Sequence, residues 1–134
     1  MVLQSLEGLP AFLAYFCVST VAVIAYLWVY TWITPYDEFD LIQKNVPGAA
    51  MALGLSLLGF ALPVASAVAH AANVLDCAIW SVIALVVQVI VYYAARIPVP
   101  NLSQRIAAGE LAPALWLGLA SITAGLLSAA SMTL

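Results

Sequence analysis

Hydrophobic residues of this chain fall into four long stretches, separated by short segments that hold most of the charged positions. The stretches cover about residues 10–34, 48–70, 75–95 and 111–132. The hydrocarbon core of a bilayer, about 30 Å thick, takes roughly 20 apolar residues of helix per crossing, so each stretch is long enough to span it. The pattern predicts an all-α integral membrane protein whose four helices form one bundle.

Composition agrees with a membrane location and excludes several classes of soluble protein. Of the 134 residues, 66% are hydrophobic and 7% are charged, whereas an average soluble domain carries about 25% charged residues. This balance excludes a free cytosolic enzyme. Three Lys and Arg residues against six Asp and Glu residues leave no basic face for a nucleic acid. We expect a single membrane domain over residues 1–134, with no nucleic-acid partner.

The few positive charges predict how the chain is oriented. Lys44 lies between the first and second stretches, and Arg96 and Arg105 lie between the third and fourth. Loops that carry Lys and Arg face the cytoplasm, so both termini should lie on the outer side. The start of the chain lacks the positive region of a secretory signal, and its apolar stretch exceeds the roughly 7 to 15 residues of a signal core. We expect the first helix to stay in the mature protein.

Aromatic residues support the predicted span boundaries. Trp28, Tyr30 and Trp32 crowd the cytoplasmic end of the first stretch, and Tyr92 and Tyr93 do the same for the third. Such residues form belts at the interface between membrane and water. Trp28 and Trp32 share a helical face, which as an alternative suggests a stacking site for a flat ligand.

The chain shows a weak internal duplication, with repeats at about residues 10–70 and 75–133. Each repeat consists of a span, a short amphipathic segment and a span rich in small residues. The two hairpins would enter the membrane in the same sense, which makes the repeat parallel, not inverted. The recurring motifs are Leu41, Gln43 and Lys44, matched by Leu102, Gln104 and Arg105, and residues 53–55, matched by residues 117–119.

Two short interfacial helices are predicted on the cytoplasmic side. Thr34 as N-cap and Pro35 at the first helical position predict a helix over residues 35–45. In the second repeat, Asn101 is the candidate N-cap of a shorter helix.

Small residues recur at helical spacing in the second and fourth stretches. Faces of this kind let two helix backbones approach closely inside a membrane. We interpret them as the contact between a central pair of helices, with a pore lined by small residues and hydroxyls as the alternative. The predicted packing residues are Gly48, Ala52, Ser56, Gly59, Gly118, Ser121, Gly125 and Ala129.

Pro63 interrupts the second stretch and frees the carbonyl of Gly59, one turn earlier, from its helical hydrogen bond. A kink is expected there, and Pro63, Ser66 and Gln88 are candidates for a small polar niche. Gln88 lies near the middle of the third stretch, where an unpaired amide is costly. We interpret it as a contact between helices, with a substrate contact as the alternative.

Near the outer turn, His70, Asp76 and Cys77 lie close together in sequence. Their spacing fits no metal-binding pattern, so we predict no metal site and interpret His70 and Asp76 as an interfacial pair. Cys17 and Cys77 are expected to be small apolar fillers, because a disulfide between them requires favourable rotation of two helices.

No catalytic residue or cofactor is predicted. The chain has no nucleotide-binding loop, nucleophile elbow or metalloprotease helix. Its single histidine excludes haem held by two facing histidines within one chain.

Asp37, Glu38 and Asp40 form the one acidic run, and Lys44 follows Asp40 by four residues. A solvated helix start explains these charges. The functional alternative is a surface that docks a cytoplasmic partner.

Several segments of the chain resemble a known family: residues 34–38 (TPYDE), followed by Leu41, Ile42 and Asn45, and residues 58–67 (LGFALPVASA). They resemble the YjfL-like family of bacterial inner-membrane proteins, the domain of unknown function that carries the number three hundred and fifty. The resemblance implies a four-span protein of the bacterial inner membrane. The positions of the Lys and Arg residues then place both termini in the periplasm. It assigns no activity and no catalytic residue. Members are often encoded beside membrane-stress proteins of the PspA type and ATP-grasp ligases, which implies an envelope role and a cytoplasmic partner of such a kind.

The leading functional hypothesis is a non-catalytic membrane module that oligomerises and docks a cytoplasmic partner. The alternatives are a transporter or channel for a small solute or ion, and a redox enzyme that uses a quinone or another bound cofactor. Because four spans make a thin bundle with little interior, we expect a homo-oligomer, with the dimer as the default.

Overall fold

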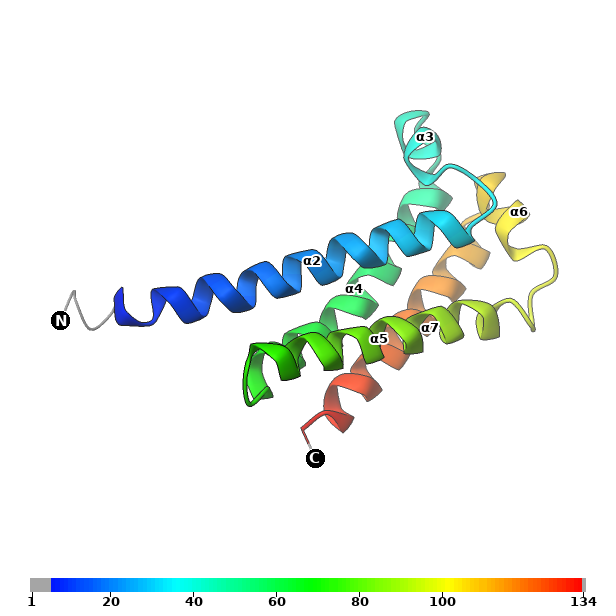
Figure 1. The fold of residues 1–134 in the computed structure, drawn as a ribbon. Coiled ribbons are helices and arrows are strands. Elements are labelled where there is room, and N and C mark those ends of the chain that lie inside the picture. The colour runs from blue at the N-terminus through cyan, green and yellow to red at the C-terminus, as the bar shows by residue number, and fades with distance from the viewer. Residues whose placement is uncertain (1–5, 134) are drawn as a thin grey trace.

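The computed structural model describes residues 6–133, which fold into helices joined by short loops. Four helices are long and apolar enough to cross a membrane: α2 (Leu9–Ile33), α4 (Pro47–His70), α5 (Val74–Ala95) and α7 (Leu111–Ser131) (Figure 1). Each begins and ends within one residue of the stretch predicted from the hydrophobic pattern, so the four predicted spans are confirmed as long apolar helices. The extreme termini, whose outer placement was predicted, lie outside the described residues.

A short helix, α3 (Glu38–Gln43), follows α2 and is shorter than predicted. The prediction that Thr34 caps it is wrong, because Asp37 is the N-cap and its Oδ1 accepts a hydrogen bond from the Asp40 amide at 3.2 Å. Thr34 instead ends α2, where its own amide donates to the Tyr30 carbonyl at 3.1 Å. Pro35 explains the difference, since the residue before a proline is driven out of the helical region.

A second short helix, α6 (Leu102–Ala107), lies between α5 and α7, as predicted. Asn101 precedes it in the left-handed region, with φ of 59°, and its side chain makes no capping hydrogen bond. The prediction of Asn101 as a side-chain cap is therefore wrong. Asparagine tolerates this conformation better than most residues, so it permits the turn into α6.

The most extensive helix contact joins α4 and α7, which run in the same direction. A side chain at Gly125 would overlap the backbone of Gly59, and one at Gly118 would overlap Leu55. A Cβ atom at Gly59 would lie 2.5 Å from the Ser121 carbonyl oxygen. The two backbones are close because these positions carry no side chain.

The other predicted packing residues lie along the same contact. Ala52 and Ser56 are buried on α4, and Gly48 packs against the turn before α7, where a Cβ would lie 3.0 Å from the Glu110 carbonyl oxygen. Ala129 is half-buried near the far end of α7. The small residues of the two helices thus follow one line from end to end of the bundle.

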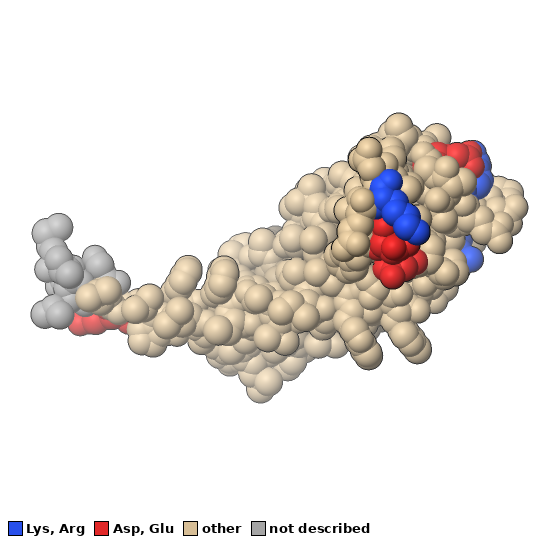
Figure 2. Space-filling view, turned by 90° about the horizontal axis from the view of Figure 1, so that it is seen from above, with Lys and Arg blue, Asp and Glu red and all other residues tan. Residues whose placement is uncertain are grey.

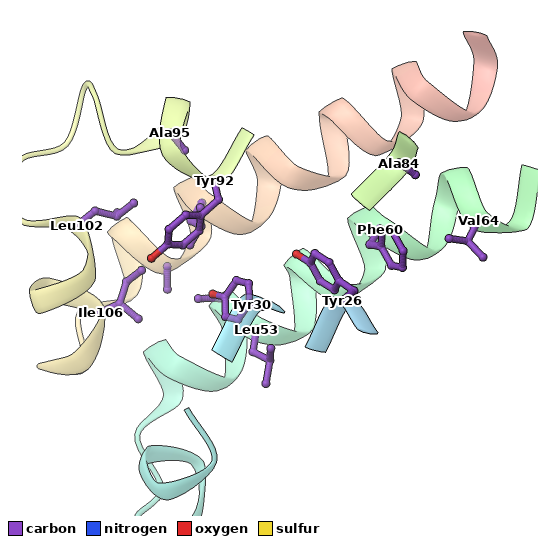
Figure 3. Packing of buried hydrophobic residues seen from close by; sticks show 13 residues of the cluster. Tyr26, Tyr30, Leu53, Phe60, Val64, Ala84, Tyr92, Ala95, Leu102 and Ile106 are labelled. Atoms are coloured by element: carbon purple, nitrogen blue, oxygen red, sulfur yellow. The ribbon is translucent and has the colours of Figure 1, made fainter. Parts of the chain in front are cut away.

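Aromatic rings fill the core between α2, α4 and α5 (Figure 3). Tyr26 stacks on Phe60 with ring centroids 4.6 Å apart, and Tyr30 meets Tyr92 edge to face at 5.7 Å. The prediction that Tyr30 and Tyr92 belong to interfacial belts is therefore wrong, because helix rotation turns both rings into the bundle. Trp28 and Trp32 lie on the opposite face of α2 and remain exposed.

The first half of α2 extends away from the other helices (Figure 1). Leu9, Phe12 and Phe16 are exposed there. Within the hydrophobic 18-residue segment of each helix, 6% is buried inside the protein in α2 and 44% in α4. This half of α2 offers its apolar side chains to lipid or to another membrane protein.

Candidate functional site

A polar network crosses the middle of the bundle around Gln88 of α5. Its Nε2 donates to the Gly59 carbonyl of α4 and to the Ser121 carbonyl of α7, each at 3.2 Å. Its Oε1 accepts a hydrogen bond from the Ser121 hydroxyl. Gln88 is 2% exposed, and both of its amide hydrogens have partners, so this buried amide ties three helices together.

Pro63 explains why the Gly59 carbonyl accepts the hydrogen bond from Gln88. Proline has no N–H, so this carbonyl lacks the donor that an ordinary residue at position 63 would supply. The structure thus brings Pro63 and Gln88 together through Gly59. Ser66 lies outside the network, since its hydroxyl donates to the Ala129 carbonyl at 2.8 Å. The predicted niche of all three residues is therefore two separate polar contacts.

One hydroxyl beside the network has no partner within the described chain. The Ser56 Oγ is buried without a hydrogen bond. The nearby Ser121 hydroxyl lies 3.3 Å from the backbone carbonyl of Ser56 and does not bond to the Ser56 side chain. A buried unsatisfied hydroxyl costs free energy. It is a polar atom available to a small ligand or a water molecule near the middle of the membrane.

A buried carboxyl lies at the end of the bundle formed by residues 34–46 and 96–110, which we name the charged end. Glu38 of α3 is 1% exposed, and its Oε1 accepts a hydrogen bond from the Thr34 hydroxyl. Two cations of this end pair with other acids: Lys44 with Asp40 at 2.9 Å, and Arg105 with Glu110 at 2.9 Å. The third, Arg96, lies 5.9 Å from the ring centres of Tyr92 and Tyr93 and makes no ion pair among the described residues. Glu38 therefore has no ion-pair partner among the described residues.

Burial raises the pKa of Glu38 to about 7, a backbone N–H opposes this rise, and the nearby Asp37 adds to it. Protonation near neutral pH follows from taking the charged form out of water without a compensating cation. Glu38 can therefore hold or release a proton near neutral pH.

Tyrosine rings surround this carboxyl. Tyr30 is buried, and its hydroxyl makes no well-aligned hydrogen bond among the described residues, although the Tyr36 side chain lies near enough to interact with it. The Tyr92 hydroxyl lies 3.2 Å from the Ser103 hydroxyl. Burial raises the pKa of Tyr36 and the neighbouring Tyr92 adds to the rise, the Tyr30 side chain opposes it, and Glu38 adds a smaller increase. These rings contribute no positive charge that could stabilise the ionised carboxylate of Glu38.

The burial of Glu38 was not predicted from the sequence, although the sequence contains a signal for it. Tyr30, Thr34 and Glu38 follow one another at four-residue spacing, the spacing of one helical face. Pro35 breaks the helix between them, yet the chain folds back so that Glu38 still meets Thr34.

Three of the four residues of the predicted partner surface are exposed, and the fourth, Glu38, is buried. Asp37, Asp40 and Lys44 are exposed, and Figure 2 shows acidic and basic side chains side by side at this end of the molecule. The placement of Glu38 on that surface is wrong, because α3 turns it inward against the end of α2.

The outer turn does not form the predicted polar pair. The Nδ1 of His70 lies 3.0 Å from the Ser66 carbonyl, and the Oδ2 of Asp76 accepts from the Ala72 amide at 3.0 Å. His70 and Asp76 are therefore not bonded to each other, because each satisfies its own stretch of backbone. Cys17 and Cys77 are both free thiols. No group of three His, Cys, Asp or Glu residues that could hold a metal occurs between residues 6 and 133.

An apolar cavity of about 360 Å³ opens between α2 and α5. Cys17, Val21, Phe60 and Leu85 contribute to its walls. Ser81 also lines it, and its buried hydroxyl has no hydrogen-bond partner between residues 6 and 133. Its walls suit an acyl chain or another apolar group.

Comparison with known proteins places these features in a family. The family described as "Domain of Unknown Function (DUF350)" matches residues 4–132. The chain is 38% identical over 128 residues to "UPF0719 inner membrane protein YjfL" of Escherichia coli (strain K12), covering 96% of this chain and 97% of that protein. The protein of the same name from Escherichia coli O157:H7 is similar to the same extent. No solved structure matches the chain.

Proposed function

The chain belongs to the DUF350 family of inner-membrane proteins, and we propose that it is a non-catalytic membrane module that docks a cytoplasmic protein at its charged end. The distribution of charge carries this proposal. Every Lys and Arg, and every acidic residue except Glu7 and Asp76, lies within residues 34–46 or 96–110. The rest of the molecule offers apolar surface to the bilayer, so protein recognition in water is concentrated at one end.

The same charges support the orientation of the module. The positive-inside rule places the loops with Lys44, Arg96 and Arg105 in the cytoplasm and both termini in the periplasm. A partner for the charged end is then a cytoplasmic protein, and the membrane-stress and ATP-grasp proteins named above are candidates.

The exposed face of α3 is the proposed docking surface. Asp37 and Asp40 present carboxylates to solvent, and Phe39 is half-exposed between them. An apolar ring with acidic neighbours suits a partner that carries an apolar pocket with a basic rim.

We also propose that the module assembles with further copies of itself, by default as a dimer. The free half of α2, with Phe12 and Phe16 stacked at 5.7 Å, supports this assignment because a second copy would cover apolar side chains that this chain leaves without neighbours. Membrane helices associate through such packing when the contact is close.

A parallel repeat of two helical hairpins remains part of the proposal. Asn45 after α3 and Gly109 after α6 both adopt positive φ, at 64° and 93°. Each is followed by an amide that donates back five residues, from Val46 to Leu41 at 2.9 Å and from Glu110 to Arg105 at 3.1 Å. The offset between Asn45 and Gly109 equals that between Gly54 and Gly118, which supports a duplication of these turns and the helices after them. The Leu41, Gln43 and Lys44 motif has a different offset from Leu102, Gln104 and Arg105, so a duplication that includes it requires an insertion before Gly109.

Native mass spectrometry after gentle extraction tests the docking proposal, since one spectrum reports copy number and retained protein. We expect the double variant Asp37→Lys with Asp40→Lys to lose the retained protein and keep its copy number. Glu7→Lys, which changes charge by the same amount per site far from α3, should retain it. A double variant that keeps the partner would remove the basis of the proposal.

A transporter is the second candidate. The buried Ser56 hydroxyl beside Gln88, which makes no hydrogen bond that meets normal geometry among the described residues, favours it. Flux of ions and polyamines into liposomes above that of empty vesicles, lost on Ser56→Ala, would support this function. No flux above empty vesicles would reject it.

A further inference from the structure

A second cavity, of about 530 Å³, lies at the charged end. The linker after α2 and the loop between α5 and α6 form its walls. Arg96, Asn101 and Gln104 contribute polar side chains, and Pro35, Tyr93 and Ile97 contribute apolar ones. The cavity therefore combines a cation, amide groups and an apolar edge.

Arg96 differs from the other two cations of the chain. Lys44 and Arg105 each pair with an acid, whereas Arg96 makes no ion pair among the described residues. Its guanidinium lies 5.9 Å from the ring centres of both Tyr92 and Tyr93. These rings hold the cation in place without neutralising its charge, which leaves it available to an anion.

An apolar stripe of α5 leads to this cation. Val86, Ile90 and Tyr93 share one helical face and are exposed, and the stripe continues to Ile97 just beyond the helix. Because α5 is a candidate membrane span, this stripe faces acyl chains and ends where head groups lie.

We propose that the cavity around Arg96 binds the phosphate head group of one anionic phospholipid, whose acyl chain lies along the α5 stripe. The guanidinium offers two parallel N–H groups to phosphate oxygens, and its single charge matches that of a phosphodiester. Asn101 and Gln104 supply amide groups for the rest of the head group.

The apolar stripe beside Arg96 favours a lipid over a free phosphate ion as the ligand. A soluble anion would contact Arg96 and the amides alone and gain nothing from Ile90 or Ile97. An amphipathic ligand uses both halves of the site, and it is present at high concentration where the cavity opens. The site is independent of the docking proposal, since it requires no protein partner.

Delipidated protein in neutral detergent, titrated with phosphatidylglycerol or with phosphatidylcholine of the same acyl chains, tests the proposal by native mass spectrometry. We expect one phosphatidylglycerol per chain to stay bound under conditions that remove phosphatidylcholine. Arg96→Gln should weaken this binding about tenfold, the usual effect of losing one charge-assisted contact. Arg105→Gln is the matched control, because Arg105 lies outside the cavity lining, and it should bind like the unaltered chain.

Three results would overturn the proposal: equal retention of the two lipids, unchanged binding by Arg96→Gln, or an equal loss in Arg105→Gln. Displacement of phosphatidylglycerol by excess inorganic phosphate would assign the site to a free anion instead. If Arg96→Gln proves unstable, Arg96→Lys carries the test. It keeps the charge without the paired N–H groups, so it should still prefer phosphatidylglycerol but bind it more weakly, and binding equal to that of Arg96 would contradict the role of the guanidinium.

Discussion

Gln88 donates a hydrogen bond at 3.2 Å to the Gly59 carbonyl, the group that Pro63 leaves without a helical donor. A proline in one membrane helix is thus compensated by an amide from another. The pairing places a strong polar contact where α4, α5 and α7 meet, in surroundings with little water to replace it.

Gln88→Leu should destabilise the bundle by on the order of 1 kcal/mol, because the Gly59 carbonyl and the Ser121 hydroxyl both lose a partner. In a Pro63→Ala background, the introduced alanine supplies its own amide to the Gly59 carbonyl, so the same change should cost clearly less. Thermal unfolding in detergent of the two single variants and the double variant measures this coupling. Equal costs in both backgrounds would show that Gln88 does not compensate for Pro63.

Gly125→Ala should prevent close packing of α4 and α7, because the added methyl would overlap the backbone of Gly59, which has no flexible side chain to move. Gly54→Ala is the matched control, since nothing lies within 4 Å of a Cβ there, and alanine favours a helix over glycine by up to about 1 kcal/mol. Thermal unfolding should show a large loss for the first variant and a small gain for the second. Similar stability of the two variants would contradict the observed helix contact.

Local rules were sufficient to predict the spans and the inward position of Gln88. Each span is a run of apolar residues long enough for a bilayer, and an isolated amide within such a run is costly unless it is bonded. The partner of Gln88 was not predictable, because it depends on how α5 is rotated relative to Gly59. That rotation is set by long-range packing, which no local pattern specifies.

The same dependence on helix rotation explains why Tyr30 was wrongly predicted to lie at the membrane interface. Tyr26 and Tyr30 occupy one face of α2, and Trp28 and Trp32 occupy the opposite face. The spacing shows that only one pair can face lipid, without showing which. Glu38 was misplaced for a different reason: acids at a helix start are usually solvated, but Pro35 folds α3 back onto the end of α2.

The packing of α3 against the end of α2, which we call its docked state and which involves no partner protein, should weaken as pH rises. Folding raises the pKa of Glu38 from the usual 4.5 to about 7, so the docked state binds the proton more tightly than the undocked state. Below pH 4.5 both states are protonated and docking is strongest. Between pH 4.5 and about 7 the carboxyl ionises first in the undocked state, so the free energy that favours packing of α3 against the bundle falls by up to about 3 kcal/mol. Above pH 7 no further loss is expected.

Hydrogen exchange of the α3 amides, corrected for the intrinsic pH dependence of exchange, measures this docking. Glu38→Gln should remove the pH dependence, and Asp40→Asn, which changes an exposed acid on the same helix, should keep it. Protection of α3 that is independent of pH in the unaltered chain would show that packing against the bundle does not raise the pKa of Glu38.

Tyr30 and Tyr92 offer a matched test of the buried hydroxyls near Glu38. The Tyr92 hydroxyl has a partner in Ser103 at 3.2 Å, so Tyr92→Phe should cost about 1 kcal/mol of stability. The Tyr30 hydroxyl is buried and makes no well-aligned hydrogen bond within the part of the chain that the structure describes, so Tyr30→Phe should leave stability unchanged or raise it by a similar amount. Thermal unfolding of the two variants compares them directly, since both remove one oxygen atom and keep the ring. A loss for Tyr30→Phe as large as that for Tyr92→Phe would mean that the Tyr30 hydroxyl has a partner, and Tyr36→Phe then separates the two sources: a loss that disappears in the Tyr36→Phe background assigns the partner to Tyr36, and one that persists assigns it to a bound water or ligand.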